Sequence, residues 1–290
     1  MSVYLIADSA SDLTQAEAQR LGVCLLPLTV RFGQTEYQDG VTLSGSKFYT
    51  MLAECETLPT TSQVTPWQYT QALARMAPQD EAVILTISSR LSGTMQSALA
   101  AAAGYGGRVR VVDTLSVTLG ERVLVEYAVR LRDAGYTAAA LERELLARRE
   151  QVCVLGVVDT LDYLRRGGRI SRTAALAGGL LNVKPVLTVQ NGEIVMLGKA
   201  RGLRASNNLL NQTAAARGGI HFGMPCAAGY SGLEDTALQE YLRQSAGLWQ
   251  GHIDRVPTCR LGSTIGTHVG PGAVAVAFFC PAQGPAPQTP

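Results

Sequence analysis

Short apolar runs alternate with longer amphipathic segments along most of the chain, and this alternation is typical of strands followed by helices. Strands are predicted at residues 3–7, 23–30, 82–87, 109–112, 153–158, 185–189, 194–197, 226–230, 252–256 and 274–279. Helices are predicted at residues 14–21, 66–76, 92–103, 117–134, 137–150, 205–217 and 234–245. The pattern therefore indicates an α/β protein.

Turn-forming residues and chain length add detail to the predicted arrangement of strands and helices. Asn191-Gly192 separates two apolar runs and predicts a β-hairpin, because both residues tolerate positive φ. With 290 residues the chain is long enough for two modest domains. We predict an N-terminal α/β domain at 1–150 and a C-terminal α/β domain at 151–280. The Pro-rich tail at 281–290 has no apolar anchor and is predicted to be disordered.

Composition excludes several classes of protein. Hydrophobic residues make up 47% of the chain and charged residues 17%, with a net charge of +2, so no long-range field favours nucleic acid as a partner. The first apolar run stops at Asp8, which is too early for a signal peptide or a membrane span. Six scattered cysteines without a Cys-x-x-Cys pair favour reduced thiols, and three histidines lack metal-ligand spacing. We expect a cytoplasmic protein without a metal or cofactor.

The segment 85–98 carries the first candidate site. An apolar strand runs into Ser92-Gly93-Thr94 and then into an alanine-rich helix. Free N–H groups and the helix dipole could hold a small anion there, with hydroxyls from Ser92 and Thr94 and close backbone approach at Gly93. The alternative is an ordinary N-cap supplied by Ser92. From composition alone, an ordinary N-cap is more frequent than an anion-binding site at such a segment. Both interpretations stay open.

Four other segments carry polar groups with weaker signals. The loop at 58–64 offers a side-chain amide and several hydroxyls, including those of Thr61 and Ser62. The same composition also fits an ordinary surface turn. Arginines at 165–172 fit helix C-capping as well as a recognition patch. His268 lies in a predicted tight turn at 267–272, where a lone histidine is more often structural. Arg201 follows the hairpin and could be a solvated charge.

Enzymatic alternatives have little support in the sequence. The chain contains neither a Gly-x-x-x-x-Gly-Lys phosphate loop nor a Gly-x-Gly-x-x-Gly turn after a strand. Leu233 replaces the second glycine of a nucleophile elbow after Tyr230-Ser231-Gly232. A serine-dependent hydrolase or phosphotransferase that acts on acyl groups through the Ser92 region remains the second hypothesis, and a lipid-sensing regulatory module the third.

Taken together, these segments resemble the DegV family, bacterial lipid-binding proteins that serve as fatty-acid-binding subunits of fatty acid kinase. The resemblance covers residues 3–280. It rests on Asp-Ser-Ala-Ser-Asp-Leu at 8–13, Pro-Thr-Thr-Ser-Gln at 59–63, and Ile-Ser-Ser-Arg-Leu-Ser-Gly-Thr at 87–94. It also rests on Gln-Ser-Ala at 96–98, Asp-Thr at 113–114 with Gly120, Tyr-Leu-Arg-Arg-Gly-Gly-Arg at 163–169, Leu-Asn-Val-Lys-Pro-Val-Leu at 181–187 and Thr-His-Val-Gly-Pro-Gly at 267–272.

The resemblance implies the EDD fold, two α/β domains with a lipid-binding site between them. It implies a long-chain fatty acid as ligand, no catalysis by this chain, and a separate fatty acid kinase catalytic subunit as partner. Transient membrane contact would serve ligand exchange. Thr61 and Ser92 match the positions that bind the carboxylate. The head-group vicinity is Ser62, Gly93, Thr94, Arg201 and His268.

Two further expectations accompany the resemblance. Val64 stands where the family usually has proline, a change expected to loosen that loop while its hydroxyls remain. The patch at 165–172 is the candidate docking surface for the kinase. A saturated acid would bury about fourteen methylenes at about 0.8 kcal/mol each, and its carboxylate must then be paired, because an unpaired buried charge is prohibitive.

Overall fold

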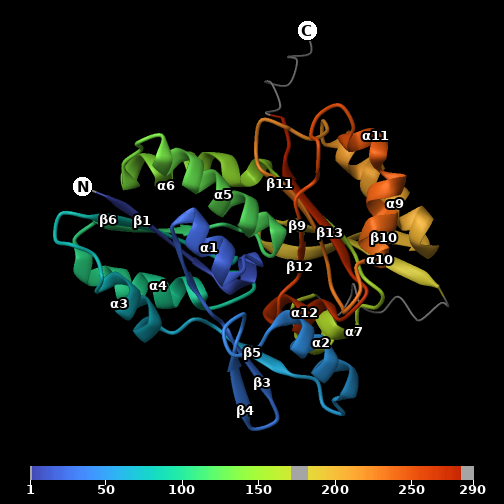
Figure 1. Cartoon of the computed structure of the whole chain (residues 1–290), viewed down its shortest axis with the longest axis horizontal. Helices are drawn as coiled ribbons and strands as arrows, with labels where there is room; N and C mark the ends of the chain where they lie inside the picture. The colour runs from blue at the N-terminus through green and yellow to red at the C-terminus, as the bar shows by residue number, and fades with distance from the viewer. Residues whose placement is uncertain (1, 171–181, 282–290) are drawn as a thin grey trace.

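The computed structural model describes residues 2–170 and 182–281, in which two large β-sheets lie side by side (Figure 1). The first sheet is wholly parallel, in the order β2-β1-β6-β7. Its strands are β1 (Val3–Asp8), β2 (Val23–Leu26), β6 (Glu81–Thr86) and β7 (Val109–Asp113). They read as continuous apolar runs because helices cover both faces of the sheet.

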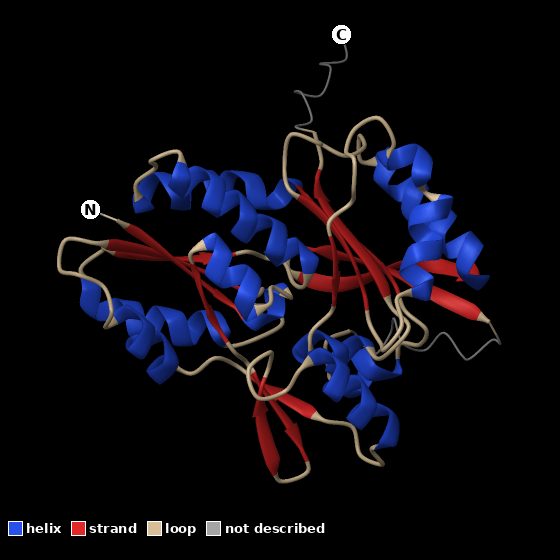
Figure 2. Ribbon diagram, in the orientation of Figure 1, coloured by secondary structure: helices blue, strands red, loops and turns tan. Residues whose placement is uncertain are grey.

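Five helices belong to this half of the molecule: α1 (Gln15–Leu21), α3 (Pro66–Leu73), α4 (Thr94–Ala102), α5 (Leu119–Asp133) and α6 (Ala138–Arg148). Figure 2 shows α3 and α4 on one face of the parallel sheet and α5 and α6 on the other. α1 packs against β2. It begins at a capping box, in which the Thr14 hydroxyl accepts from Glu17 N and the Glu17 carboxylate accepts from Thr14 N.

The second sheet has six strands in the order β10-β9-β8-β13-β11-β12. They are β8 (Val152–Val157), β9 (Val183–Gln190), β10 (Glu193–Arg201), β11 (Cys226–Tyr230), β12 (Thr258–Arg260) and β13 (Val274–Phe279). Helices α9 (Gly202–Ala216), α10 (Thr236–Gln244) and α11 (Ala246–Trp249) lie along its outer face (Figure 2). The hairpin prediction is confirmed, with φ of 51° at Asn191 and 81° at Gly192 in the β9–β10 turn.

Helix α5 joins the two sheets. It packs on β1 and β6 of the first sheet and on β8, β11 and β13 of the second. A Cβ on Gly120 would lie 2.3 Å from Val154 Cγ2, so glycine lets the helix approach β8 closely. The largest hydrophobic core accordingly contains side chains from both halves of the chain. The domain division at residue 150 stays a prediction.

A small third layer lies below the two sheets in Figure 1. It consists of the antiparallel strands β4 (Thr35–Gln38), β3 (Thr29–Phe32) and β5 (Thr60–Ser62), in that order. The short helices α2 (Gly45–Glu54), α7 (Asp162–Arg166) and α12 (Ser263–Val269) lie beside it. This layer positions several of the candidate site residues.

Three predictions of elements were wrong. The predicted strand at 23–30 is two strands, β2 and β3, separated at Pro27, which has no N–H to donate. Residues 252–256 form no strand: Ile253 and Val256 pack on the core from a loop, at a spacing of three rather than two. His268 lies in helix α12 and not in a turn. The sequence did not predict this helix because Gly266 and the β-branched Thr264 have low helix propensity.

Two predictions fall wholly or partly outside the described residues. Nearly all of the tail at 281–290 lies there, and so do Ser171 and Arg172 at the end of the arginine patch. All six cysteines are free thiols, with Cys153 and Cys226 buried and the other four half-buried.

Candidate functional site

An apolar cavity of about 360 Å³ lies between the two sheets. Its walls include Val154 of β8, Leu187 and Val189 of β9, Ala275 of β13 and Ile265 of α12. The volume lies in the range of about 300–1,000 Å³ that is typical of small-molecule pockets. The lining is mostly apolar and also contains polar side chains, among them Thr61, Ser92, Arg169 and His268, so the cavity suits a ligand that has a hydrocarbon body and a polar end.

Two small residues keep part of this cavity open. Gly156 of β8 pairs with Ala275 of the neighbouring strand β13, and both line the cavity. A Cβ built on Gly156 would make only ordinary contacts, 3.6 Å to Val274 O and 3.9 Å to Ala275 Cβ. The backbone therefore tolerates a side chain here, and the space in front of this pair is available to a ligand.

The two predicted carboxylate-binding residues line the same cavity. Thr61 lies on β5, and its Oγ1 is 2.9 Å from Nε2 of His268 on α12. Ser92 lies before α4, where its Oγ is 2.9 Å from Thr94 Oγ1 and accepts from Thr94 N at 3.3 Å. The fold thus brings three residues from distant parts of the chain, Thr61, Ser92 and His268, to one polar region of the cavity.

The turn before α4 is packed by a glutamine that the sequence did not single out. Gln63 lines the cavity and donates from Nε2 to Ser97 Oγ at 2.7 Å. A Cβ on Gly93 would lie 2.1 Å from Gln63 Oε1, so glycine at this position makes room for the amide. Helix α4 starts at Thr94 with Gly93 as its N-cap and no side-chain cap. Polar groups at this helix start remain available to a ligand.

His268 is neutral near neutral pH. Burial is the main cause that lowers the pKa of its imidazole to about 4, and the nearby charge of Arg169 contributes to the same shift. Its Nδ1 is buried without a hydrogen-bond partner in the described part of the chain. A Cβ on Gly167 would lie 2.3 Å from this Nδ1, so the glycine leaves room for the ring. His268 therefore acts as a hydrogen-bonding group and leaves the positive charge to a neighbour.

That neighbour is Arg169, which lines the cavity beside His268. Its Nη1 donates to Gly167 O at 2.6 Å and its Nε to Leu91 O at 3.3 Å, which fixes the guanidinium at the polar region. Arg201 lies exposed at the end of β10 and does not line the cavity. Its role at the head group stays a prediction. Of the other residues named from the sequence, Ser62 lines the cavity and Thr94 is buried behind Ser92.

Helix α12 is held in place by carboxylates from the N-terminal half of the chain. Asp39 accepts from the backbone N–H groups of Ser263 at 3.0 Å and Thr264 at 3.1 Å, and also from the Ser263 hydroxyl. Asp12 accepts from Gly262 N at 2.6 Å. These contacts satisfy N–H groups that the start of a helix leaves free. Because α12 carries His268, Asp39 and Asp12 position the polar region.

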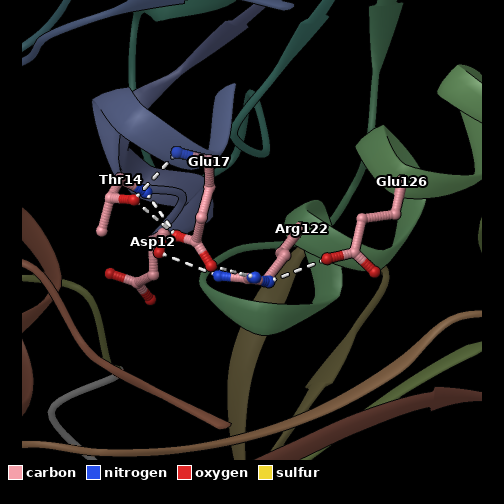
Figure 3. A network of polar contacts seen from close by, with 5 residues as sticks. All are labelled: Asp12, Thr14, Glu17, Arg122 and Glu126. Carbon is pink, nitrogen blue, oxygen red and sulfur yellow. Dashed lines mark hydrogen bonds and ion pairs between the residues drawn. The ribbon is translucent and has the colours of Figure 1, made fainter. Parts of the chain in front are cut away.

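Asp12 is itself fixed by an ion-pair network between α1 and α5 (Figure 3). Arg122 donates from Nη1 to Asp12 O at 3.3 Å, from Nη2 to Glu17 at 2.7 Å and from Nε to Glu126 at 3.0 Å. Although burial opposes it, the hydrogen bonds from Arg122 and Thr14 lower the pKa of Glu17 to about 2. Glu17 therefore stays charged beside Arg122, and their ion pair anchors the loop before α1.

Val64, the departure from the family pattern, is fully buried in the main core. The loop of Thr61 and Gln63 is therefore anchored directly behind its polar residues. In residues 2–170 and 182–281, no three His, Cys, Asp or Glu side chains gather as a metal site would require. No helix in the same ranges is both long and apolar enough to cross a membrane.

The fold and the cavity define a class: an α/β protein with a ligand cavity between two sheets, apolar in its body and polar at one region. The family model described as "Uncharacterised protein, DegV family" matches residues 2–280. A DegV domain-containing protein of Deinococcus radiodurans is 39% identical over 281 residues, which cover 96% of this chain and 98% of that protein. The chain belongs to the DegV family.

Solved structures share the fold. A DegV family protein from Thermus thermophilus, whose structure is described as showing fatty acid binding, is 35% identical with a TM-score of 0.84, over 96% of this chain and 100% of that one. The Fatty Acid Kinase (Fak) B3 protein of Streptococcus pneumoniae, loaded with linoleic acid, is 20% identical with a TM-score of 0.83, over 97% of this chain and 100% of that one. At that identity the second likeness shows the fold.

Proposed function

We propose that this protein binds a long-chain fatty acid in the cavity between its sheets and presents the carboxylate to a separate kinase. The observation that carries the proposal is the apolar cavity whose polar region holds Thr61, Ser92, Arg169 and His268 together. The fatty acid binding described for the Thermus thermophilus relative supports it. The acyl tail would occupy the space in front of Gly156 and Ala275.

The energetics favour a long tail. About fourteen buried methylenes at about 0.8 kcal/mol each give a gross gain on the order of 11 kcal/mol, which the cost of ordering the ligand reduces. The carboxylate needs charged or hydrogen-bonding partners, because its burial without them is prohibitive. Hydroxyls of Thr61 and Ser92 and the guanidinium of Arg169 supply these partners. The negative charge of a bound carboxylate would also raise the pKa of His268.

The kinase step follows the family resemblance. One carboxylate oxygen attacks the terminal phosphorus of a nucleoside triphosphate held by the partner. A new P–O bond forms, the bond to the bridging oxygen breaks, and the nucleoside diphosphate leaves with that electron pair. An acyl phosphate remains on this protein. An ionised carboxylate is already a nucleophile, so the step requires no catalytic base from this chain. Transient contact with a membrane would serve loading and release of the acid.

The double substitution of Thr61→Val and Ser92→Ala tests the carboxylate site. Each lost hydrogen bond to a charged group costs about 1.5–3 kcal/mol, so we expect palmitate to bind at least about 100-fold more weakly. Isothermal titration calorimetry on delipidated protein measures the loss. Thr35→Val, on the exposed strand β4, is the matched control and should bind normally. Unchanged affinity in the double variant would contradict the site. Hydrolysis of acyl esters by the protein alone, lost in Ser92→Ala, would instead indicate an enzyme.

Gly167→Ala tests the position of His268. Gly167 has φ −72°, which alanine adopts without strain, but its Cβ would displace the imidazole from Thr61. We expect about tenfold weaker palmitate binding, because one hydrogen bond at the head group is misplaced, with little change in thermal stability. Gly104→Ala is the control, since nothing lies within 4 Å of its Cβ position. Equal affinities for the two variants would show that His268 does not contribute.

A further inference from the structure

Two cysteines from different strands lie together on the outer face of the second sheet. Cys153 of β8 pairs with Phe278 of β13. Cys280 lies two positions further along, where its N–H donates to Gln151 O at 2.8 Å. Because side chains alternate between the faces of a sheet, Cys153 and Cys280 share the face of Phe278, and both pack in the hydrophobic cluster beneath α9 and α10. Such diagonal positions bring the side chains of neighbouring strands within reach of each other, and the Cys153 thiol donates a hydrogen bond to Cys280 Sγ.

The two thiols differ in exposure and in acidity. Cys153 is fully buried, whereas Cys280 is half-buried directly after the end of β13. The hydrogen bond from Cys153 lowers the pKa of the Cys280 thiol, and the positive charge of Arg217, the residue after α9, adds to this effect although partial burial opposes it. The same hydrogen bond, together with burial, raises the pKa of Cys153. Cys280 is therefore the accessible thiolate of the pair, and Cys153 is the protonated thiol behind it.

We propose that Cys280 and Cys153 form a peroxide-sensitive dithiol site, in which Cys280 reacts with the oxidant and Cys153 closes a disulfide. The Cys280 thiolate attacks one oxygen of hydrogen peroxide; an S–O bond forms, the O–O bond breaks, and hydroxide leaves with the electron pair. The sulfur of Cys153 then attacks the resulting sulfenic acid. The S–S bond forms, the S–O bond breaks, and the hydroxyl group leaves as water with the Cys153 proton. The two sulfurs are oxidised and the peroxide is reduced. The new bond joins β8 and β13, whose other face lines the acyl cavity.

The test treats the reduced full-length protein with hydrogen peroxide and maps its peptides by mass spectrometry without reductant. We expect a disulfide-linked peptide pair that joins Cys153 to Cys280 and that dithiothreitol reverses. Cys280→Ser should abolish this link. In Cys153→Ser the oxidation should stop at a sulfenic acid on Cys280, which dimedone traps. Cys226→Ser is the matched control, because Cys226 is a buried thiol that pairs with Phe278 from the other neighbouring strand. It should leave the link between Cys153 and Cys280 unchanged.

Cys24 provides an internal reference in the same samples. It is half-buried like Cys280, but burial raises the pKa of its thiol. We expect peroxide to oxidise Cys280 at least about tenfold faster than Cys24, because the thiolate is the reactive form. Equal rates at the two cysteines, or a peptide map without the link between Cys153 and Cys280, would overturn the proposal. A link that forms in the unmodified protein and in Cys226→Ser, with a dimedone adduct on Cys280 in Cys153→Ser, supports it.

Discussion

Replacing Gly156 with leucine is expected to abolish tight binding of long-chain fatty acids while the fold remains intact. Gly156 lines the acyl cavity, and a Cβ there meets only ordinary van der Waals contacts. A leucine side chain would therefore extend into the space that the tail needs. Excluding about four methylenes costs about 3 kcal/mol, at about 0.8 kcal/mol each, which is a loss on the order of 100-fold in affinity.

Titration with palmitate measures this loss, and thermal unfolding reports whether the fold is intact. Gly156→Ala is the matched control: it adds one methyl group at an ordinary distance and should bind within a few-fold of the unmodified protein. If Gly156→Leu bound palmitate as tightly as Gly156→Ala, the tail would not run past this pair of strands. The assignment of the cavity to the acyl chain would then be wrong.

Removing the carboxylate of Asp39 is expected to have the largest effect on stability. Asp39 is only 3% exposed and accepts from Ser263 and Thr264 at the start of α12 and from the Ser9 hydroxyl at 3.0 Å. Asp39→Ala leaves these buried donors without a partner, at about 1–3 kcal/mol each. We expect the free energy of unfolding to fall by about 3–5 kcal/mol, measured by urea denaturation.

Asp39→Asn provides the graded control, because its remaining oxygen still accepts from one of the donors. It should fall between the unmodified protein and Asp39→Ala in stability. Palmitate affinity should decrease in the same order, since α12 carries His268. A loss of less than about 1 kcal/mol for Asp39→Ala would show that the carboxylate does not hold α12 in place.

The sequence predicts the elements whose signals are local. The strands at 226–230 and 274–279 are found within those bounds, because buried apolar runs between turn residues mark them. The β9–β10 hairpin follows from two residues, Asn191 and Gly192. Helix α12 escaped prediction because its start depends on Asp39, which lies 224 residues from Ser263 in the chain.

The residues of the candidate site likewise divide into those that a sequence motif indicates and those that depend on contacts between distant parts of the chain. The family resemblance named Thr61, Ser92 and His268, and the structure places all three at one polar region. Gln63 was visible only as the amide of the loop at 58–64, and Asp39 carried no local signal. The importance of both residues arises from their contacts with Gly93 and with α12. Arg169 was visible only as one member of an arginine patch. Its place beside His268 depends on how α12 and the segment after α7 meet.

The turn at Ser92-Gly93-Thr94 has two interpretations from its sequence, an ordinary N-cap and an anion-binding site, and the structure is compatible with both at once. Gly93, not Ser92, is the N-cap of α4, and no side-chain cap closes the helix. Ser92 bonds loosely to Thr94 and lines the cavity. In the proposed complex the ligand carboxylate completes this helix start, so that the cap and the binding site are one structure.

Native mass spectrometry of the freshly purified full chain tests the central claim most directly. We expect an adduct with the mass of a long-chain fatty acid on the unmodified protein and on Gly156→Ala, and its absence from Gly156→Leu. Delipidated protein should regain the adduct when palmitate is added. An unmodified protein that carries no fatty acid and takes up none of the added palmitate would contradict the account.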